Sequence, residues 1–488
     1  MQVNGFSVPG VILDRNPEFV ELYQTAWRLA AEHIKDIPGL PVVHHMDEAC
    51  DPSRLWIWDT CFMVHFCKYA PKDFPGIESL DNFYLPMLDG VKSPCLIHHP
   101  DNPPLFAWTE YEYWRFTGDN SRLHRNLVEK RYLQRHYEFM ENLCAGDKFP
   151  FSYVQANFHK TNRGYMWSGI ASGMDNTPRG EDMPYNILWV DALAQMALSA
   201  LYIARMAAAI GETAIEAEYT AKYQDHAKLL NDCYFDERDG SYYDLWIANY
   251  DYARILTPAS FWPLLAEAAS PERAERQISV LQNPELLGGK VPITTVARNS
   301  PYFEPDGCYW RGSIWLPDSY MVMRALIKYD RLDLAAELAE RTVTHMAAAC
   351  RDFSPATIWE CYSPTGTKPA VTRRGERLVR PDFCGWSALG PISMLIENIL
   401  GFYNVDAIEK VVKYHYRPIG RHGITDFCFG EVCCDIIIEN DGKIHVKSNH
   451  PFELELNNKR IPCPAGTSII GIKEYENLKT AQDASKRA

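Results

Sequence analysis

The sequence predicts an all-α fold, an (α/α)6 toroid with a small C-terminal β appendage, and three observations lead to this prediction. The chain of 488 residues is 47% hydrophobic and 23% charged, which supplies enough apolar material for a large buried core. Apolar residues recur at helix spacing from residue 16 to about 402. After residue 405 the pattern changes to alternating, strand-like runs. We therefore expect a helical catalytic domain at residues 1–405 and a β-rich appendage with a tail at residues 406–488.

The helical part is expected to contain about twelve helices. In its most regular stretch, apolar side chains stand at positions i, i+3, i+4, i+7, i+8 and i+11 counted from Leu193. Twelve helices in antiparallel pairs can close into a ring whose connecting loops gather at one end. Start and stop signals place the helices near residues 17–35, 58–69, 76–89, 104–117, 119–142, 184–210, 212–232, 258–267, 271–282, 312–329, 330–350 and 385–400.

Four connections between these helices are longer than ordinary loops. They span residues 143–183, 233–257, 283–311 and 351–384. Long connections within a compact domain are usually functional, and these contain most of the motifs described below.

The appendage is expected to contain a hairpin. Strand-like runs at residues 433–438 and 443–446 flank the turn signal Asn440-Asp441-Gly442. The polar tail after Glu474 is expected to be a helix end or a frayed terminus.

The charge of the chain argues against nucleic acid and membranes as partners. With 49 basic and 63 acidic residues, the net charge of −14 repels phosphate backbones and anionic lipids. The richest apolar window, from Gly385 to Tyr403, is interrupted by Glu397 and is expected to be a buried helix. The N-terminus lacks an apolar stretch of signal-peptide length, so we expect a cytoplasmic protein.

The fourteen cysteines are expected to be reduced core thiols rather than a disulfide framework. The sequence contains no CxxC pair and no HExxH motif. We therefore expect neither a metal nor another cofactor.

Four tracts are unusually rich in aromatic and polar residues for a helical protein. They are residues 56–60, 172–179, 307–315, and the pair 359–362 with 383–386. Flat aromatic faces and a few fixed polar groups are what a carbohydrate pocket needs. Any one of these aromatic residues is as well explained as a core anchor, but together the tracts favour a sugar site.

Cleavage of a glycosidic bond requires an acid on one face of the sugar and a base or nucleophile on the other. Asp175 follows Gly173 and precedes Pro178, a rigid turn in which an apolar pocket would raise the pKa of the carboxyl group. Glu360 lies between Trp359 and Tyr362 and is the second candidate. A lone Asp in a turn is more often a cap, so these positions alone leave the assignment open.

A family resemblance strengthens it. The tracts SGMDNTPR, YWRGSIWLPDSYMVMRAL, IWECYSPTG and FCGWSALGPISMLIE occur in this order and resemble the signature of the inverting (α/α)6 glycosidases of glycoside hydrolase family 63. That family groups processing α-glucosidases with bacterial mannosylglycerate and glucosylglycerate hydrolases, and the trehalases of family 37 are relatives. The resemblance spans residues 56 to about 400. It implies inverting hydrolysis of a small α-linked glucoside or mannoside, a disaccharide or a glycosylglycerate.

The resemblance also implies roles for individual residues. Asp175 matches the general acid and Glu360 the general base, with Cys361 where the family has Asn. Ser313 replaces a common proline, and Cys384 intrudes into the motif that contains Trp386. The substrate-binding residues implied are Trp56, Trp58, Asp59, Trp108, Asn176, Arg179, Tyr309, Trp310, Arg311, Trp315 and Trp386.

Several alternatives remain open at this point. Arg179 fits a structural ion pair as well as a substrate contact, and the basic loop from Arg373 to Arg380 fits either a solvated surface or a site for an anionic leaving group. A sugar epimerase or isomerase would use histidines for proton transfer. The available histidines are His44, His45, His98 and His99, which the pattern favours as surface or structural residues. The other alternative is a non-catalytic sugar-binding relative, and oligomeric state has no signature in the sequence.

Overall fold

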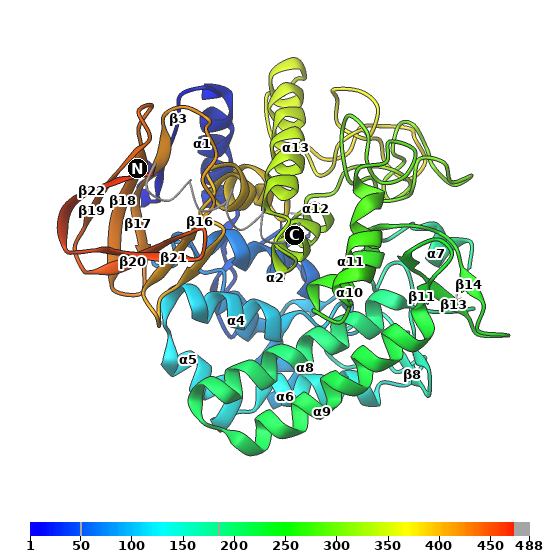
Figure 1. The fold of residues 1–488 in the computed structure, drawn as a ribbon. Helices are drawn as coiled ribbons and strands as arrows, with labels where there is room; N and C mark the ends of the chain where they lie inside the picture. Colours follow the sequence, from blue (N-terminus) through cyan, green and yellow to red (C-terminus); the bar gives the residue numbers. More distant parts are fainter. Residues whose placement is uncertain (49–50, 184–185, 473–488) are drawn as a thin grey trace.

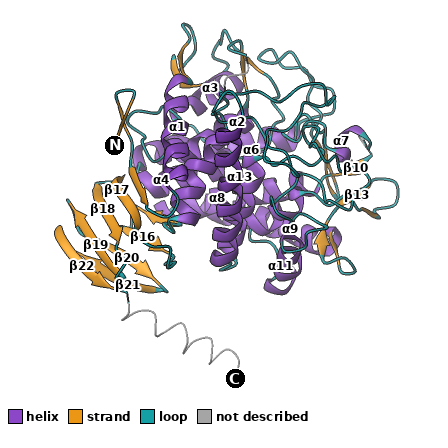
Figure 2. Cartoon of the chain, turned by 90° about the horizontal axis from the view of Figure 1, so that it is seen from above, coloured by secondary structure: helices purple, strands orange, loops and turns teal. Residues whose placement is uncertain are grey.

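The computed structural model of the chain describes residues 1–48, 51–183 and 186–472. It contains a large helical body with a strand-rich part on one side (Figures 1 and 2). The predicted tail after Glu474 and the first two residues of the helix expected at 184–210 lie outside the described residues.

Six helical segments form the centre of the body. They contact one another in the cyclic order α2, α4, α8, α10, α12, η7 and back to α2. Every residue of α2 and of η7 is buried, because other elements cover them on both sides. The six segments are α2 (Ile57–Cys67), α4 (Phe106–Thr117), α8 (Val190–Ile210), α10 (Trp262–Leu265), α12 (Leu316–Lys328) and η7 (Gly390–Ile399).

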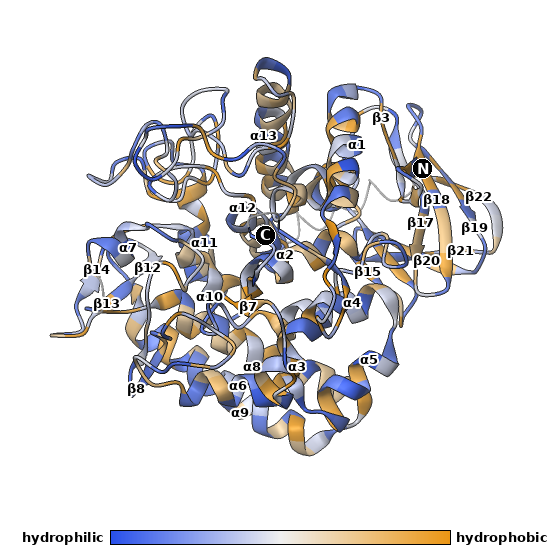
Figure 3. Cartoon of the chain, turned by 180° about the vertical axis from the view of Figure 1, so that it is seen from behind, coloured by the Kyte–Doolittle hydropathy of each residue, from blue (hydrophilic) through white to orange (hydrophobic). Residues whose placement is uncertain are grey.

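Six further helices alternate with this inner ring along the chain. Helix α9 packs on α8, α13 packs on α12 and η7, and α1 packs on η7 and α13. Figure 3 shows polar and apolar residues alternating along α1 and α13, as expected of helices with one buried face. The outer helices are α1 (Pro17–Glu32), α3 (Asp81–Asp89), α6 (Tyr132–Asn142), α9 (Thr213–Leu229), α11 (Pro271–Ile278) and α13 (Leu332–Asp352).

Each of the twelve predicted helices overlaps one of these segments, and several boundaries differ from the prediction. The helix expected at 119–142 is divided into α5 (Asn120–His124), η2 (Arg125–Glu129) and α6, because Arg131 adopts a left-handed conformation with φ +52°. Helix α8 begins at Val190, after β10 (Ile187–Leu188). Helix α12 begins at Leu316 rather than 312, with Pro317 in its first turn.

The fold is not purely helical, since short strands pair within the long connections. Runs of two or three residues are too short to show an alternating pattern, which is why the sequence did not reveal them. Among the described residues, five of these sheets have two strands: β1 (Gln2–Val3) with β2 (Phe6–Ser7), β4 (Ile34–Asp36) with β5 (His44–Met46), β6 (Arg54–Leu55) with β7 (Leu96–Ile97), β8 (His159–Thr161) with β9 (Gly164–Met166), and β11 (Phe235–Asp236) with β12 (Ser241–Tyr242). A further sheet has three strands in the order β10, β13 (Asp244–Trp246) and β14 (Tyr252–Ala253).

Strands after residue 403 form two sheets. One has the order β15-β16-β20-β21 and the other β22-β19-β18-β17-β3. The second sheet therefore includes β3 (Gly10–Leu13), an N-terminal strand that the sequence analysis did not identify. The predicted turn at residues 440–442 lies between β18 and β19, whose antiparallel register is confirmed by the pair Ile438 and Ile444. The other strands are β15 (Asn404–Asp406), β16 (Val411–Tyr414), β17 (His422–Phe429), β18 (Val432–Ile438), β19 (Lys443–Ser448), β20 (Phe452–Leu456), β21 (Lys459–Cys463) and β22 (Gly466–Gly471).

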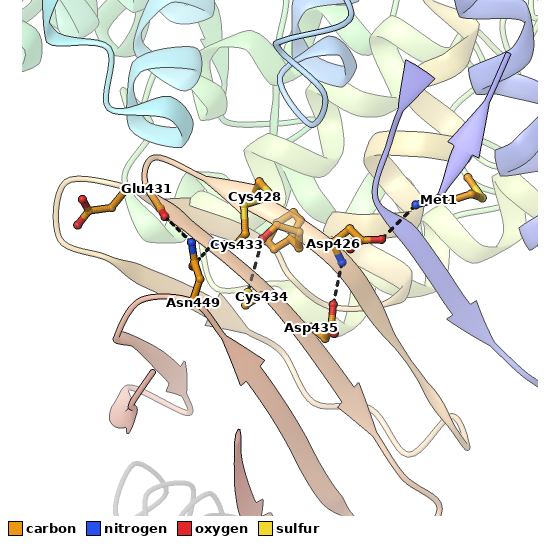
Figure 4. Close-up of a disulfide and its surroundings, with 9 residues drawn as sticks. Met1, Asp426, Cys428, Glu431, Cys433, Cys434, Asp435 and Asn449 are labelled. Carbon is orange, nitrogen blue, oxygen red and sulfur yellow. Dashed lines mark hydrogen bonds and ion pairs between the residues drawn. A yellow bond between two sulfur atoms is a disulfide. The ribbon is translucent and has the colours of Figure 1, made fainter. Parts of the chain in front are cut away.

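One pair of cysteines departs from the expectation of reduced thiols. Cys428 and Cys433 form a disulfide (Figure 4). They lie directly opposite each other at the end of the β17–β18 hairpin, with their Cα atoms 4.0 Å apart. Most of the other described cysteines are buried, as predicted.

Helix α8 is long and apolar enough to cross a membrane by length and composition. It is the one such helix among the described residues, and 78% of its most apolar window is buried inside the protein. Its place in the inner ring, against α4, α9 and α10, accounts for this apolar composition. The sequence analysis had instead taken residues 385–403 as the richest apolar window.

Asp318, in the first turn of α12, makes the free energy of unfolding depend on pH. It is 1% exposed, neither carboxyl oxygen has a hydrogen-bond partner among the described residues, and burial together with Asp191 raises its pKa to about 8. Between the ordinary pKa and 8 the folded chain keeps a proton that the unfolded chain has lost, so the folded state becomes less stable as pH rises through this window.

We predict that Asp318→Asn, which removes this ionisation, raises the melting temperature relative to wild type by an amount that grows from pH 5 to pH 8. Thermal unfolding followed by circular dichroism across that range measures the difference. Asp225→Asn, at an exposed position of α9, is the control and is expected to show a constant difference. A constant difference for Asp318→Asn would contradict the prediction.

Candidate active site

The four aromatic tracts meet in a pocket of about 380 Å3, called the inner pocket below. This volume lies at the small end of the usual range for ligand sites. Of the predicted site residues, the inner pocket is lined by Trp56, Trp58, Asp59, Asp175, Tyr309, Trp310, Trp315 and Trp386.

A second, wider pocket of about 870 Å3 adjoins the first and is called the outer pocket. The two pockets share Asp175, Tyr309 and Arg380 as wall residues. Glu360 lines the outer pocket together with residues 372–381. Asp175 therefore lies at the junction of the two pockets, and Glu360 contacts two of the residues that form that junction, Tyr309 and Arg380.

A row of aromatic rings forms one wall of the inner pocket. The rings of Trp310 and Trp315 stack with their centroids 4.0 Å apart and their planes 15° apart. Trp386 follows at 5.5 Å from Trp315. The indole N–H of Trp386 donates to the backbone carbonyl of Glu360 at 3.1 Å, and that of Trp315 donates to the carbonyl of Tyr309 at 3.2 Å. The rings are thus fixed in place and present rigid apolar surface.

The start of α2 forms another part of the lining of the inner pocket. Asp59 lies in the first turn of the helix and is 6% exposed, and its burial, together with the nearby Glu48, raises its pKa well above the ordinary value. The ring of Trp58 packs against Gly173, which has φ +85°. A Cβ atom at Gly173 would lie 2.7 Å from the indole, so only glycine lets the loop that carries Asp175 approach this closely.

Asp175 is partly buried, with 33% of its side chain exposed. Burial raises the pKa of its carboxyl group, while Arg373 and His99 oppose that rise. The guanidinium of Arg373 lies 2.8 Å from Oδ2 of Asp175. The net upward direction suits a group that must carry a proton.

Glu360 is held in one orientation. Its side chain is 2% exposed, the hydroxyl of Tyr309 donates to Oε1 at 2.8 Å, and Nη2 of Arg380 donates to the same oxygen at 2.9 Å. The backbone N–H of Glu360 also donates to the carbonyl of Arg380 at 3.0 Å. Cys361 is fully buried and lines neither pocket, so its difference from the family pattern does not alter the walls of the site.

Four of the predicted substrate-binding residues do not line either pocket. Arg179 is 1% exposed, and its guanidinium makes four hydrogen bonds of 2.6–3.0 Å to Asp191 and Asp244. It therefore forms structural ion pairs with these two carboxylates. Arg311 pairs with Glu181 and Asp182 outside the pockets.

Trp108 and Asn176 also belong to the framework. Trp108 is buried among the inner helices, with its ring 4.3 Å from that of His65. Nδ2 of Asn176 donates to the carbonyl of Cys308 at 2.9 Å, and its Oδ1 accepts from the N–H of Trp310 at 2.8 Å. Sequence reasoning could not separate these residues from the pocket walls, because buried aromatic and amide groups share the same motifs.

Other wall residues were not predicted from the sequence. His98 and His99 were expected to be surface or structural residues but line the inner pocket, whereas His44 and His45 lie on β5 and do not line this pocket. Burial and the nearby His99 lower the pKa of His98 to about 3, so it is neutral near pH 7. No sequence signal marked these two histidines, because the two-residue strand β7 that precedes them is too short to be recognised from its pattern. The remaining wall residues that were not predicted are Asp51, Arg54, Asn102, Ile170 and Gly173, whereas Arg380 belongs to the basic loop whose role the sequence left open.

No cluster of three or more His, Cys, Asp or Glu side chains in the described parts of the chain is arranged to hold a metal ion.

Comparison with known proteins identifies relatives of this architecture. A family model described as the mannosylglycerate hydrolase MGH1-like glycoside hydrolase domain matches residues 97–374. An uncharacterized protein of Borreliella burgdorferi is 25% identical over 92% of this chain and 95% of its own length. A probable mannosyl-oligosaccharide glucosidase of Schizosaccharomyces pombe is 27% identical over 54% of this chain. The match spans only 34% of the glucosidase's own length.

A solved structure shares the fold. The family 63 mannosylglycerate hydrolase of Thermus thermophilus, in complex with glucose, superposes with a TM-score of 0.58 and 16% identity. The superposition covers 76% of this chain and 99% of that one.

Asn176 supports a strained segment of the site. Cys308 and Tyr309 both have positive φ, +35° and +70°. The two hydrogen bonds of Asn176 hold the carbonyl of Cys308 and the N–H of Trp310, which lie on either side of Tyr309. Tyr309 in turn reaches Glu360.

We predict that Asn176→Ala lowers the free energy of unfolding by about 2–4 kcal/mol, because it leaves a buried N–H and a buried carbonyl without their partners. We also expect hydrolase activity to fall about tenfold or more, because the segment of Tyr309 and the loop that carries Asp175 lose the hydrogen bonds that join them. Urea unfolding and steady-state kinetics measure the two effects. Asn142→Ala, at an exposed position of α6, is the control, and an Asn176→Ala variant as stable and active as this control would refute the role.

Proposed function

The chain belongs to the mannosylglycerate hydrolase MGH1-like glycoside hydrolases, and we propose that it cleaves a small α-linked glucoside or mannoside with inversion. In this proposal Asp175 is the general acid and Glu360 the general base. The observation that carries the proposal is the junction of the two pockets, where Asp175 forms part of both walls and Glu360 is held by Tyr309 and Arg380.

The inner pocket is proposed to bind the sugar that is released as the glycone. The row formed by Trp310, Trp315 and Trp386 offers apolar faces to the C–H surfaces of the ring. Asp59, which also lines this pocket, is proposed to hold hydroxyls of the same sugar. The glycosidic oxygen then lies at the pocket junction, within reach of Asp175.

Hydrolysis follows from these positions. Asp175 gives a proton to the glycosidic oxygen as the bond to the anomeric carbon breaks. Glu360 takes a proton from a water molecule, whose oxygen bonds to the opposite face of that carbon. Tyr309 and Arg380 fix the carboxylate of Glu360 so that its free lone pairs point in one direction. An α-linked substrate therefore yields the β-anomer.

The outer pocket is proposed to bind an acidic leaving group such as glycerate. Its wall contains Arg373, Arg374, Arg377 and Arg380, against the acidic side chains Asp175, Glu360 and Glu376. Of these acidic groups, Asp175 and Glu360 are already in ion pairs. A carboxylate on the leaving group would therefore meet an excess of positive charge.

The histidine-based epimerase alternative has little support in this site. The family match and the glucosidase relative are glycoside hydrolases. His98 is neutral because its pKa is about 3, so it does not exchange protons near neutral pH.

We predict that Asp175→Asn and Glu360→Gln each lower the rate of hydrolysis by about 10²- to 10⁴-fold, because each removes one proton-transfer group. Proton NMR during incubation with α-glucosides, α-mannosides and glycosylglycerates is expected to detect the β-anomer first with the wild type. Asp182→Asn, which alters an exposed carboxylate paired with Arg311, is the control expected to retain activity. Release of the α-anomer first, or full activity in either variant, would contradict the assignment.

We also predict a preference for an α-glycoside of glycerate over the matching α-glycoside of glycerol. Since the preference comes from charge, it is expected to shrink as ionic strength rises from about 0.01 to 0.5 M, where the Debye length falls below about 5 Å. Steady-state kcat/KM for both compounds at several salt concentrations measures this. Equal kcat/KM values at low salt would show that the outer pocket does not select for charge.

A further inference from the structure

The basic segment of the outer pocket is a short hairpin. Val371 and Leu378 are bridged, and the N–H of Thr372 donates to the carbonyl of Arg377 at 2.9 Å. The N–H of Gly375, which has φ +69°, donates to the carbonyl of Thr372 at 2.8 Å and closes the turn. Arg373 lies in this turn, two residues after the bridged Val371.

Two arginines of this segment reach the two proposed catalytic carboxylates in different ways. Arg380 lies beside Glu360 along the backbone, and hydrogen bonds run to the carboxylate of Glu360 from the backbone N–H of Arg380 at 3.3 Å and from its Nη2 at 2.9 Å. Arg373 comes from the hairpin turn, and 38% of its side chain is exposed. Its guanidinium lies 2.8 Å from Oδ2 of Asp175, 4.0 Å from Glu181 and 5.8 Å from the ring centroid of Tyr309.

The position of Arg373 conflicts with the work assigned to Asp175. Asp175 and Tyr309 line both pockets, so a guanidinium bound to Asp175 occupies the junction where the glycosidic oxygen must lie. A guanidinium has donors and no acceptor, so the oxygen that it contacts cannot also donate a proton to it. The positive charge favours the ionised carboxylate, whereas a general acid must hold a proton.

We propose that Arg373 is a latch that opposes protonation of Asp175 in the free enzyme and is drawn away from it by the carboxylate of an acidic leaving group. This inference rests on the proposed hydrolase function and adds a specificity-determining role for Arg373. When the guanidinium pairs with the leaving group, Asp175 takes a proton from solvent and passes it to the glycosidic oxygen. Glu360 takes a proton from the attacking water and returns it to solvent, so no net proton is consumed.

An acidic group is the partner that can release this latch. Away from Asp175 the guanidinium of Arg373 remains among Arg374, Arg377 and Arg380 in the outer pocket, where Glu376 and the nearby Glu181 compensate only part of the added positive charge. A carboxylate compensates that charge, and a neutral leaving group does not. Recognition of the leaving group and protonation of the acid are therefore coupled in one exchange of ion pairs.

The pH dependence of catalysis distinguishes this latch from a simple binding residue. The charged or titratable groups that act on Asp175 are Arg373, His99, Glu360 and Asp59. Because the acid is active when protonated, the rate falls as pH rises through its pKa, and loss of Arg373 removes a group that lowers that pKa.

The test compares Arg373→Gln with Arg374→Gln and Arg373→Lys, using α-glycosides of glycerate and of glycerol over a range of pH. We expect Arg373→Gln to lower kcat/KM for the glycerate compound by about 10- to 100-fold, as for loss of a charged hydrogen bond, and not to lower it for the glycerol compound. The alkaline limb of kcat/KM is expected to move to higher pH. Arg374→Gln is expected to weaken the glycerate compound alone without moving the limb, and Arg373→Lys to keep the limb close to wild type.

Two outcomes would overturn the latch. One is an alkaline limb that stays in place in Arg373→Gln or moves equally in Arg374→Gln. The other is an equal loss of both substrates in Arg373→Gln, which would indicate a structural role. If the wild type cleaves none of the α-glycosides, the proposed function fails and the latch fails with it, whereas cleavage with an unmoved limb refutes the latch alone.

Discussion

The buried guanidinium of Arg179 holds the loop that carries Asp175 against the helical ring, and the geometry of the site depends on this contact. It joins the start of the short helix α7 (Pro178–Glu181) to Asp191 on α8 and Asp244 on β13, and its central carbon lies 4.5 Å from the ring centroid of Trp189. Removing one partner from such a buried pair typically costs about 3–5 kcal/mol, because a charge is then left without compensation. Asp175 lies four residues before Arg179, so this buried group of ion pairs helps to fix the position of the proposed proton donor.

The electrostatics around these ion pairs follow from how the inner helices begin. Helices α2, α8 and α12 each start directly after a tryptophan in an extended conformation, at Trp56, Trp189 and Trp315, and each has an aspartate in its first turn. Helix N-termini favour negative charge, so these aspartates gather at the end of the ring that carries the site. Arg179 compensates only part of this charge, and Asp318 accordingly retains a proton up to a pKa of about 8. One end of the ring thus holds the charged groups, and two of the three tryptophans, Trp56 and Trp315, also line the inner pocket.

Much of the fold was predictable because helix periodicity depends on residues close in sequence. The stripe on α8 and the aromatic tracts could be recognised for that reason. The pairing of β3 with β17 could not, since it joins the two ends of the chain. Within the site, the motifs around Asp175 and Glu360 identified two loops that reach the pockets, but they did not show that Asn176 faces the backbone of Cys308 while Asp175 faces the pocket. Neighbouring side chains in a tight turn point in different directions, and only the path of the backbone decides which of them reaches the pocket.

The two ion pairs of the site differ in burial, and this difference fits their proposed roles. The carboxylate of Glu360 is 2% exposed and is bound through both the backbone and the side chain of Arg380, so loss of this partner would leave a buried carboxylate without compensation. Asp175 and Arg373 are 33% and 38% exposed, where water screens the attraction and an ion pair is typically worth only about 1 kcal/mol or less. A base that must keep one orientation is paired where separation is costly, and an acid that must change its protonation state is paired where separation is cheap. The segment from Val371 to Arg380 therefore provides a fixed partner, Arg380, for the carboxylate of Glu360 and an exchangeable partner, Arg373, for that of Asp175.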